Sequence, residues 1–201
     1  YHPHGDTSIS DAIKPLCNWF ETYIPLLWSE SNMGSMQGDR AAAPRYTEVM
    51  LNRFTLDYVL KDVLEAHDVV DWVKNYSGDK DEPESLPVAV PLLLINGTYG
   101  IGTGKAVSIP PHNTTEVIDA TLRLLDDPNA PVVLVPDQCM PCDIIDNNWK
   151  QISNTGSGKF TVRAHIDIEI MNKGTAKEHQ ALIIKSVPND VFIDKGNAEN
   201  G

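Results

Sequence analysis

The chain of 201 residues, 41% hydrophobic and 22% charged, has the composition of a globular protein and is long enough for one large or two small domains with real cores. No run of about 20 apolar residues occurs, which excludes a membrane-spanning helix, and the first residues carry no signal-peptide pattern. The net charge of -12 disfavours a nucleic-acid partner unless the 16 lysines and arginines gather on one surface or missing segments supply positive charge.

The chain opens with the pattern of a helix. Asp6 can cap a helix that begins at Thr7. Its apolar residues fall at helical spacing and predict a buried stripe of Ile9, Ala12, Ile13, Leu16, Trp19 and Phe20. His2 and His4 stand just before this helix, where backbone N–H groups and the helix dipole favour an anion.

Three further segments complete the first half of the chain. Residues 29–40 are polar and contain glycine, which predicts a loop. Residues 49–66 are amphipathic and predict a second helix. Residues 77–85 are charged and contain glycine and proline, so we expect a domain boundary there.

From residue 87 the pattern changes to that of strands. Residues 88–95 form a short apolar run that predicts a strand, although Pro91 interrupts it. Residues 97–105 predict a flexible glycine loop, and they fail both nucleotide-binding templates because Tyr99 and Lys105 occupy glycine positions. A helix capped by Thr114 or Thr115, a strand, a second helix and two strands are then expected over residues 114–125, 132–135, 144–152, 159–170 and 181–187.

An arginine directly followed by a tyrosine stands ahead of the second helical segment, at Arg45 and Tyr46. A phenol ordinarily has a pKa of about 10, so it is a poor nucleophile unless a neighbouring group stabilises the phenolate. A guanidinium stays charged and can hold phosphate oxygens in a bidentate fork. The pair can therefore attack a phosphodiester and stabilise the charge that develops at phosphorus. The alternative is a tyrosine packed at a helix start beside a surface arginine.

Several separate motifs follow one another along nearly the whole chain. They are Tyr1-His2-Pro3-His4-Gly5-Asp6, Asn32-Met33-Gly34-Ser35, Gly38-Asp39-Arg40-Ala41-Ala42-Ala43-Pro44-Arg45-Tyr46-Thr47-Glu48, Asp81-Glu82-Pro83, Leu94-Ile95-Asn96-Gly97, Gly100-Ile101-Gly102-Thr103-Gly104 and Ile109-Pro110-Pro111-His112-Asn113. In this order they closely resemble the breakage-reunion subunit of type IIA DNA topoisomerases, the group of gyrase, topoisomerase IV and related viral enzymes. Because the chain begins inside the first motif, we expect a fragment of a longer polypeptide.

The resemblance implies an α+β fold in two parts. Residues 1–85 would form a winged-helix (CAP-like) domain with a truncated N-terminus and the catalytic tyrosine. Residues 86–201 would form part of an α/β tower domain, in which Gly156-Ser157-Gly158-Lys159 matches the glycine turn of the family.

The resemblance also implies roles for individual residues. Tyr46 and Arg45 would be catalytic, with Tyr46 as the nucleophile. The residues expected to contact DNA are His2, His4, Arg40, Ile101 and Lys105, of which Lys105 departs from the family, because relatives often carry methionine or tryptophan at its position. Ile101 would be an apolar wedge that enters between base pairs and bends the duplex, the alternative being an isoleucine in a buried strand. Thr7 and Asp11 match positions where quinolone-type inhibitors, through a bridging metal ion, contact bacterial enzymes.

The implied function is that of an ATP-dependent type II DNA topoisomerase, an isomerase. Tyr46 would become joined to the 5′ end of a broken strand, a second protomer would cut the other strand, and both breaks would reseal after strand passage. Mg²⁺ would be held by a TOPRIM domain on the partner subunit or on an upstream segment, and ATP by a separate ATPase domain. This chain would thus hold no metal and be inactive alone.

The resemblance further implies partners and a location. The partners would be double-stranded DNA, the TOPRIM/ATPase subunit or domain, and a second copy of the same polypeptide through segments outside this chain, with no membrane. The location would be the bacterial cytoplasm at the nucleoid, the host cell for a viral enzyme, or the nucleus for a eukaryotic one.

Two rival functions are compatible with parts of the sequence. Cys139-Met140-Pro141-Cys142 lies between an expected strand and an expected helix, as a thioredoxin-like thiol-disulfide redox motif does, and a helix N-terminus lowers a thiol pKa. Together with Cys17 these make three cysteines, an odd and low number that indicates a reducing compartment. No second cysteine pair or histidine pair completes a zinc site. The other rival is a non-catalytic DNA-binding module.

Overall fold

The computed structural model describes residues 3–145, 148–189 and 191, together with the backbone but not the side chain of Lys105. The helices are α1 (Asp6–Cys17), α2 (Lys61–Glu65), α3 (Leu92–Ile95), α4 (Thr114–Asp126) and α5 (Trp149–Thr155), with the 3-10 turns η1 (Pro44–Tyr46) and η3 (His67–Val69) and the π-helical turn η2 (Thr55–Val59). The strands pair antiparallel two by two, as β1 (Leu27–Ser29) with β2 (Val49–Leu51), β3 (Trp72–Lys74) with β4 (Asp81–Pro83), β5 (Thr98–Gly102) with β6 (Lys105–Ile109), β7 (Asp143–Ile144) with β8 (Val162–Arg163), and β9 (Ile166–Met171) with β10 (His179–Ile184). The mixture of helices and strands agrees with the expected α+β class.

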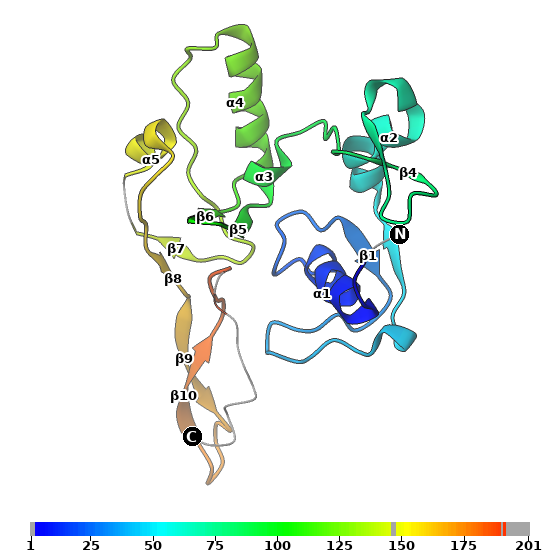
Figure 1. The fold of residues 1–201 in the computed structure, drawn as a ribbon. Coiled ribbons are helices and arrows are strands. Elements are labelled where there is room, and N and C mark those ends of the chain that lie inside the picture. Colours follow the sequence, from blue (N-terminus) through cyan, green and yellow to red (C-terminus); the bar gives the residue numbers. More distant parts are fainter. Residues whose placement is uncertain (1–2, 146–147, 190, 192–201) are drawn as a thin grey trace.

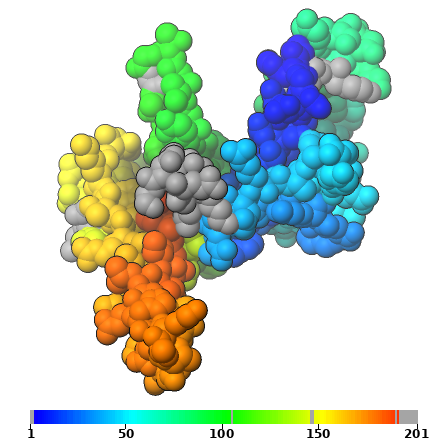
Figure 2. Space-filling model, turned by 90° about the horizontal axis from the view of Figure 1, so that it is seen from below, coloured from blue at the N-terminus to red at the C-terminus, as the bar shows by residue number. Residues whose placement is uncertain are grey.

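The molecule is extended, with several arms. Figure 1 shows α4 rising from the β5–β6 region, the β9–β10 hairpin descending, and the α2–β4 region standing apart. In Figure 2 the green arm of α4 and the orange arm of β9–β10 project in opposite directions. The accessible surface is 14562 Å², whereas a compact monomer of 22.2 kDa would expose about 9,400 Å². Among the residues that the structure describes, few apolar side chains are buried: Met33, Val59, Val70, Ile95, Val117, Ala120 and Met140.

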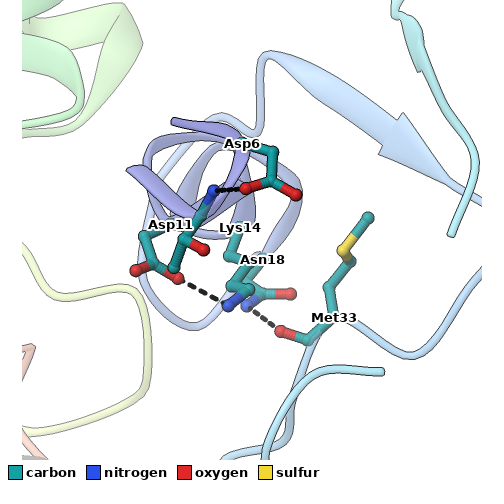
Figure 3. A network of polar contacts seen from close by, with 6 residues as sticks. Asp6, Asp11, Lys14, Asn18 and Met33 are labelled. Atoms are coloured by element: carbon teal, nitrogen blue, oxygen red, sulfur yellow. Dashed lines mark hydrogen bonds and ion pairs between the residues drawn. The ribbon is translucent and has the colours of Figure 1, made fainter. Parts of the chain in front are cut away.

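Helix α1 confirms the first predicted helix but not its expected cap. Gly5 is the N-cap residue, and Asp6 lies inside the first turn, where its carboxylate accepts the N–H of Thr7 at 2.9 Å (Figure 3). No residue of α1 is fully buried, so the apolar stripe is only partly covered. Beyond the helix, the buried Asn18 side chain donates to the carbonyl of Met33 at 3.1 Å, which ties α1 to the following loop.

The prediction of one helix over residues 49–66 is wrong at its start. Val49–Leu51 is strand β2, paired with β1 in the register Leu27↔Leu51, Trp28↔Met50 and Ser29↔Val49. The helical turns begin only after Asn52, whose Oδ1 accepts the N–H of Thr55 at 2.8 Å, as an N-cap side chain does. The β-branched Val49 also suits a strand better than a helix.

The charged segment expected as a domain boundary contains the second strand of a hairpin. Strand β4 pairs with β3, and Gly78 turns the chain between them with a φ of 73°. Buried Asn75 organises this turn, because its Oδ1 accepts the N–H groups of Asp79 and Lys80 at 3.2 and 3.3 Å. A boundary near residue 85 stays a prediction.

The predictions for residues 88–105 need two corrections. Leu92–Ile95 is a short helix rather than a strand, and Pro91 is its N-cap residue. The expected glycine loop is the β5–β6 hairpin, in which Gly102 pairs with Lys105. Gly104 has a φ of 75°, which glycine adopts without strain and which closes the two-residue turn.

Helix α4 confirms the helix expected from residue 114, with a different cap. Asn113 is the N-cap residue, and its Oδ1 accepts the N–H groups of Thr115 and Glu116 at 3.0 and 3.3 Å. The strand expected over residues 132–135 is not formed, and the neighbouring Pro136 makes an isolated bridge to His112.

The last third largely follows the predicted order. Residues 143–155 hold β7 and α5 instead of one helix over 144–152, and α5 ends at Gly156 with a φ of 65°. The strand expected over residues 159–170 is divided into β8 and β9, which pair with β7 and β10, respectively, and β10 confirms the strand expected over residues 181–187. No helix in the described part of the chain is long and apolar enough to cross a membrane.

Candidate nucleic-acid interface

Arg45 and Tyr46 lie in the short turn η1. Pro44 begins this 3-10 turn, and its fixed φ suits a first helical position. The N–H of Tyr46 donates to the carbonyl of Ala43 at 2.9 Å, and the Thr47 hydroxyl donates to the carbonyl of Pro44 at 3.0 Å. The local sequence thus determines where both side chains leave the backbone.

Two hydrogen bonds to the preceding loop hold the chain on both sides of this turn. The N–H of Ala42 donates to the carbonyl of Asn32 at 2.9 Å, ahead of the tyrosine. The N–H of Glu48 donates to the Ser31 hydroxyl at 2.8 Å, behind it. Ser31 could not be predicted from the sequence, because a serine in a polar loop carries no signal of the backbone group it will meet.

The tyrosine and the arginine face solvent and each other. The Tyr46 residue is 67% exposed, and the guanidinium carbon of Arg45 lies 4.6 Å from the centroid of its ring. Arg45 is exposed as well. This exposure disagrees with the alternative of a packed tyrosine.

The other residues predicted to meet DNA lie on the surface where they are described. His4 is exposed just ahead of α1, and Arg40 is exposed in the loop that leads to η1. His2 lies outside the described residues. Lys105 begins β6, but its side chain is also outside the described part. The two residues predicted for inhibitor contact, Thr7 and Asp11, are exposed on α1, and Lys14 pairs with Asp11 at 2.7 Å (Figure 3).

Ile101 is 76% exposed in the β5–β6 hairpin, opposite Ala106 and next to the turn. Its exposure excludes the alternative of a buried strand residue and fits an apolar wedge. In Figure 1 this hairpin and the sky-blue turn at residues 44–46 lie on different sides of α1.

The structure does not favour the redox alternative. Burial raises the pKa of the Cys139 thiol to about 11, although the Asn189 side chain bonded to its sulfur acts in the opposite sense. Strand β7 follows Cys142, so the helix N-terminus expected to activate a thiol is not there. Both cysteines are free, and the described residues contain no group of three or more His, Cys, Asp or Glu side chains that could hold a metal ion.

Comparison with known proteins identifies relatives along almost the entire chain. The family model for the A subunit of DNA gyrase and topoisomerase IV matches residues 1–197. The DNA gyrase A protein of Granulibacter bethesdensis is 40% identical over 198 residues, which cover 95% of this chain and 20% of that protein. The corresponding gyrase protein of Pseudomonas aeruginosa is 39% identical over 195 residues, 94% of this chain and 21% of the relative. The chain thus spans about a fifth of the length of these curated relatives.

Proposed function

Because the chain belongs to the family of the DNA gyrase and topoisomerase IV A subunits, we propose that it contributes the DNA-cleaving tyrosine of a type II DNA topoisomerase, an isomerase. The exposed Tyr46 with the Arg45 guanidinium at its ring is the observation that supports this most directly. The thiol-disulfide alternative lacks an activated cysteine.

In the proposed reaction Tyr46 exchanges one phosphodiester for another. Its phenolic oxygen loses a proton and attacks a DNA phosphorus, and the bond from phosphorus to the 3′ oxygen breaks. The 3′ oxygen leaves with a proton as a hydroxyl, and the 5′ phosphate stays joined to the tyrosine. The Arg45 guanidinium stabilises the negative charge on the phosphate oxygens in the transition state. Since the bond energy is conserved, the cut reverses without ATP.

The domain assignment belongs to the same proposal. Residues 1–85 would be the winged-helix domain that carries Tyr46, and residues 86–201 part of the tower domain. Duplex DNA would lie across both, with Ile101 entering a base step and with His2, His4, Arg40 and Lys105 near phosphates. The net charge of -12 implies that this chain alone binds DNA weakly and that binding falls with salt.

The described residues do not fit a magnesium site. The acids nearest the tyrosine in sequence are Asp39 and Glu48. Asp39 accepts the Ser35 hydroxyl at 2.6 Å, and no group of three metal-ligating side chains occurs among the described residues. We assign Mg²⁺ to a TOPRIM domain on the partner subunit or on an upstream segment and ATP to a separate ATPase domain, and assign dimerisation to segments outside this chain. The nucleoid would be the site of action in a bacterium. The 201-residue chain with magnesium should yield no tyrosine-linked DNA.

The substitution Tyr46→Phe tests the proposal in the full-length polypeptide, assembled with its TOPRIM-bearing partner. It removes one hydroxyl from an exposed side chain, so covalent DNA attachment should disappear while folding and DNA binding persist. Tyr76→Phe is a matched control, because Tyr76 is 76% exposed and lies in the β3–β4 hairpin. Adducts at the wild-type level in the Tyr46→Phe protein would refute the assignment.

A further inference from the structure

Asn96 stands immediately before the β5–β6 hairpin, and its side chain bonds a residue 72 positions earlier in the chain. Its Oδ1 accepts the N–H of Ile24 at 2.7 Å, and its Nδ2 donates to the carbonyl of the same residue at 3.0 Å. One amide side chain thus satisfies both backbone groups of Ile24, as a neighbouring strand would. This is a two-point link between the tyrosine-bearing half and the half with Ile101.

On the hairpin side, close backbone packing and hydrogen bonds hold the residues next to Asn96. Gly97 has a φ of 71°, and a Cβ there would lie 2.6 Å from the carbonyl oxygen of Ile109. The ring Nδ1 of the buried His112 lies 2.9 Å from the Leu94 carbonyl oxygen, and the backbone N–H of His112 donates to the carbonyl of Ile95 at 3.3 Å. The hairpin cannot turn freely about Asn96 because both of its ends are held.

On the other side, Ile24 belongs to a segment that leads directly to the tyrosine region. The next two carbonyls, of Pro25 and Leu26, accept hydrogen bonds from the side chains of Asn52 and Thr55. Strand β1 then begins and pairs with β2, which starts three residues after Tyr46. A chain of hydrogen bonds and paired strands therefore joins Asn96 to the catalytic turn.

We propose that Asn96 is a positioning residue that fixes the Ile101 hairpin relative to the strand pair next to Tyr46. A duplex bent at Ile101 then presents its phosphate to Tyr46 in a fixed position. Removing the Asn96–Ile24 hydrogen bonds would let the hairpin shift and would misplace the phosphate. The inference rests on the proposed function, because it assigns Asn96 to the same cleavage reaction.

A double-mutant cycle in the full-length enzyme, with its TOPRIM-bearing partner, magnesium and duplex DNA, tests the proposal. Asn96→Ala and Ile101→Ala should each slow formation of tyrosine-linked DNA at saturating DNA, by about 10- to 100-fold. The double variant should be no slower than the slower single variant, because both substitutions interrupt one path. Rate losses that multiply in the double variant would overturn the inference.

Controls separate positioning from general destabilisation. Asn75→Ala removes an asparagine whose side-chain hydrogen bonds stay within the β3–β4 hairpin. If Asn75→Ala lowers the cleavage rate at all, its rate loss should multiply with that of Ile101→Ala in the double variant. Asn96→Asp keeps an acceptor for the Ile24 N–H but places an oxygen against its carbonyl, so it should behave like Asn96→Ala. If Asn96→Ala does not fold, the cycle is run with Asn96→Asp.

The outcome for Tyr46 distinguishes failure of the positioning role from failure of the proposed function. If Tyr46→Phe abolishes adducts and the Asn96 and Ile101 losses multiply, the positioning role is wrong and the proposed function stands. If Tyr46→Phe still forms adducts, the proposed function itself fails.

Discussion

The Arg45 guanidinium lies over the ring of its own neighbour, Tyr46, with the guanidinium carbon 4.6 Å from the ring centroid. A cation over an aromatic face is attracted by the ring quadrupole. The pair belongs to one short turn that begins with Pro44, and hydrogen bonds to Asn32 and Ser31 in the preceding loop hold the chain on both sides of it. In the proposed reaction this cation would stabilise the charge that develops on the phosphate.

Arg45→Ala should slow formation of the covalent adduct by about 100- to 1,000-fold, as removal of a transition-state charge contact does. Arg45→Lys should recover only part of the rate, because lysine keeps the charge but lacks the planar fork. Single-turnover cleavage at saturating DNA measures both effects. An unchanged rate in Arg45→Ala would remove Arg45 from the reaction.

Ile101→Ala should weaken duplex bending and cleavage with little change in the free energy of unfolding, because the side chain is 76% exposed. Ile95→Ala is the contrasting control, since Ile95 is 0% exposed and its truncation should cost about 2–5 kcal/mol. Thermal melts and a fluorescence bending assay separate the two. A large stability loss in Ile101→Ala without a bending defect would contradict the wedge.

Cys139 should react slowly with iodoacetamide at pH 8. Burial raises its pKa to about 11, roughly two units above the ordinary value, so the folded chain has about 100-fold less thiolate than the unfolded one. The raised pKa favours the folded state below the unfolded pKa, and this contribution is lost as the pH rises through about 11. Mass spectrometry of labelled Cys139, with and without urea, gives the two rates. Equal rates would revive the redox alternative.

Asn113→Ala should destabilise the chain by about 0.5–2 kcal/mol, because it leaves two N–H groups of α4 without their capping oxygen. Asn113→Asp should retain most of the stability. Thr115→Ala is the control, since this threonine contributes only its backbone N–H to the cap. Urea titrations of the three variants measure the differences, and a larger loss in Thr115→Ala would show that the cap is misassigned.

Local features were the ones that the sequence predicted well. The 3.6-residue period of α4 and the alternation in β9 and β10 predict element type because each depends on neighbours in the chain. The adjacency of Arg45 and Tyr46 likewise needs no tertiary contact. The order of the motifs predicted the family, which the match over residues 1–197 confirms.

Only the tertiary structure decided the features that depend on contacts between residues far apart in the sequence. Val49–Leu51 is a strand because β1 offers it a ladder, which outweighs its helical spacing. The raised pKa of Cys139 comes from burial, and no local pattern reports burial. Asn96 has the pattern of a turn residue beside Gly97, yet its side chain bonds Ile24 across the molecule. A hydrogen bond needs both groups within about 3 Å, and only the folded chain brings residues so distant in sequence to that separation.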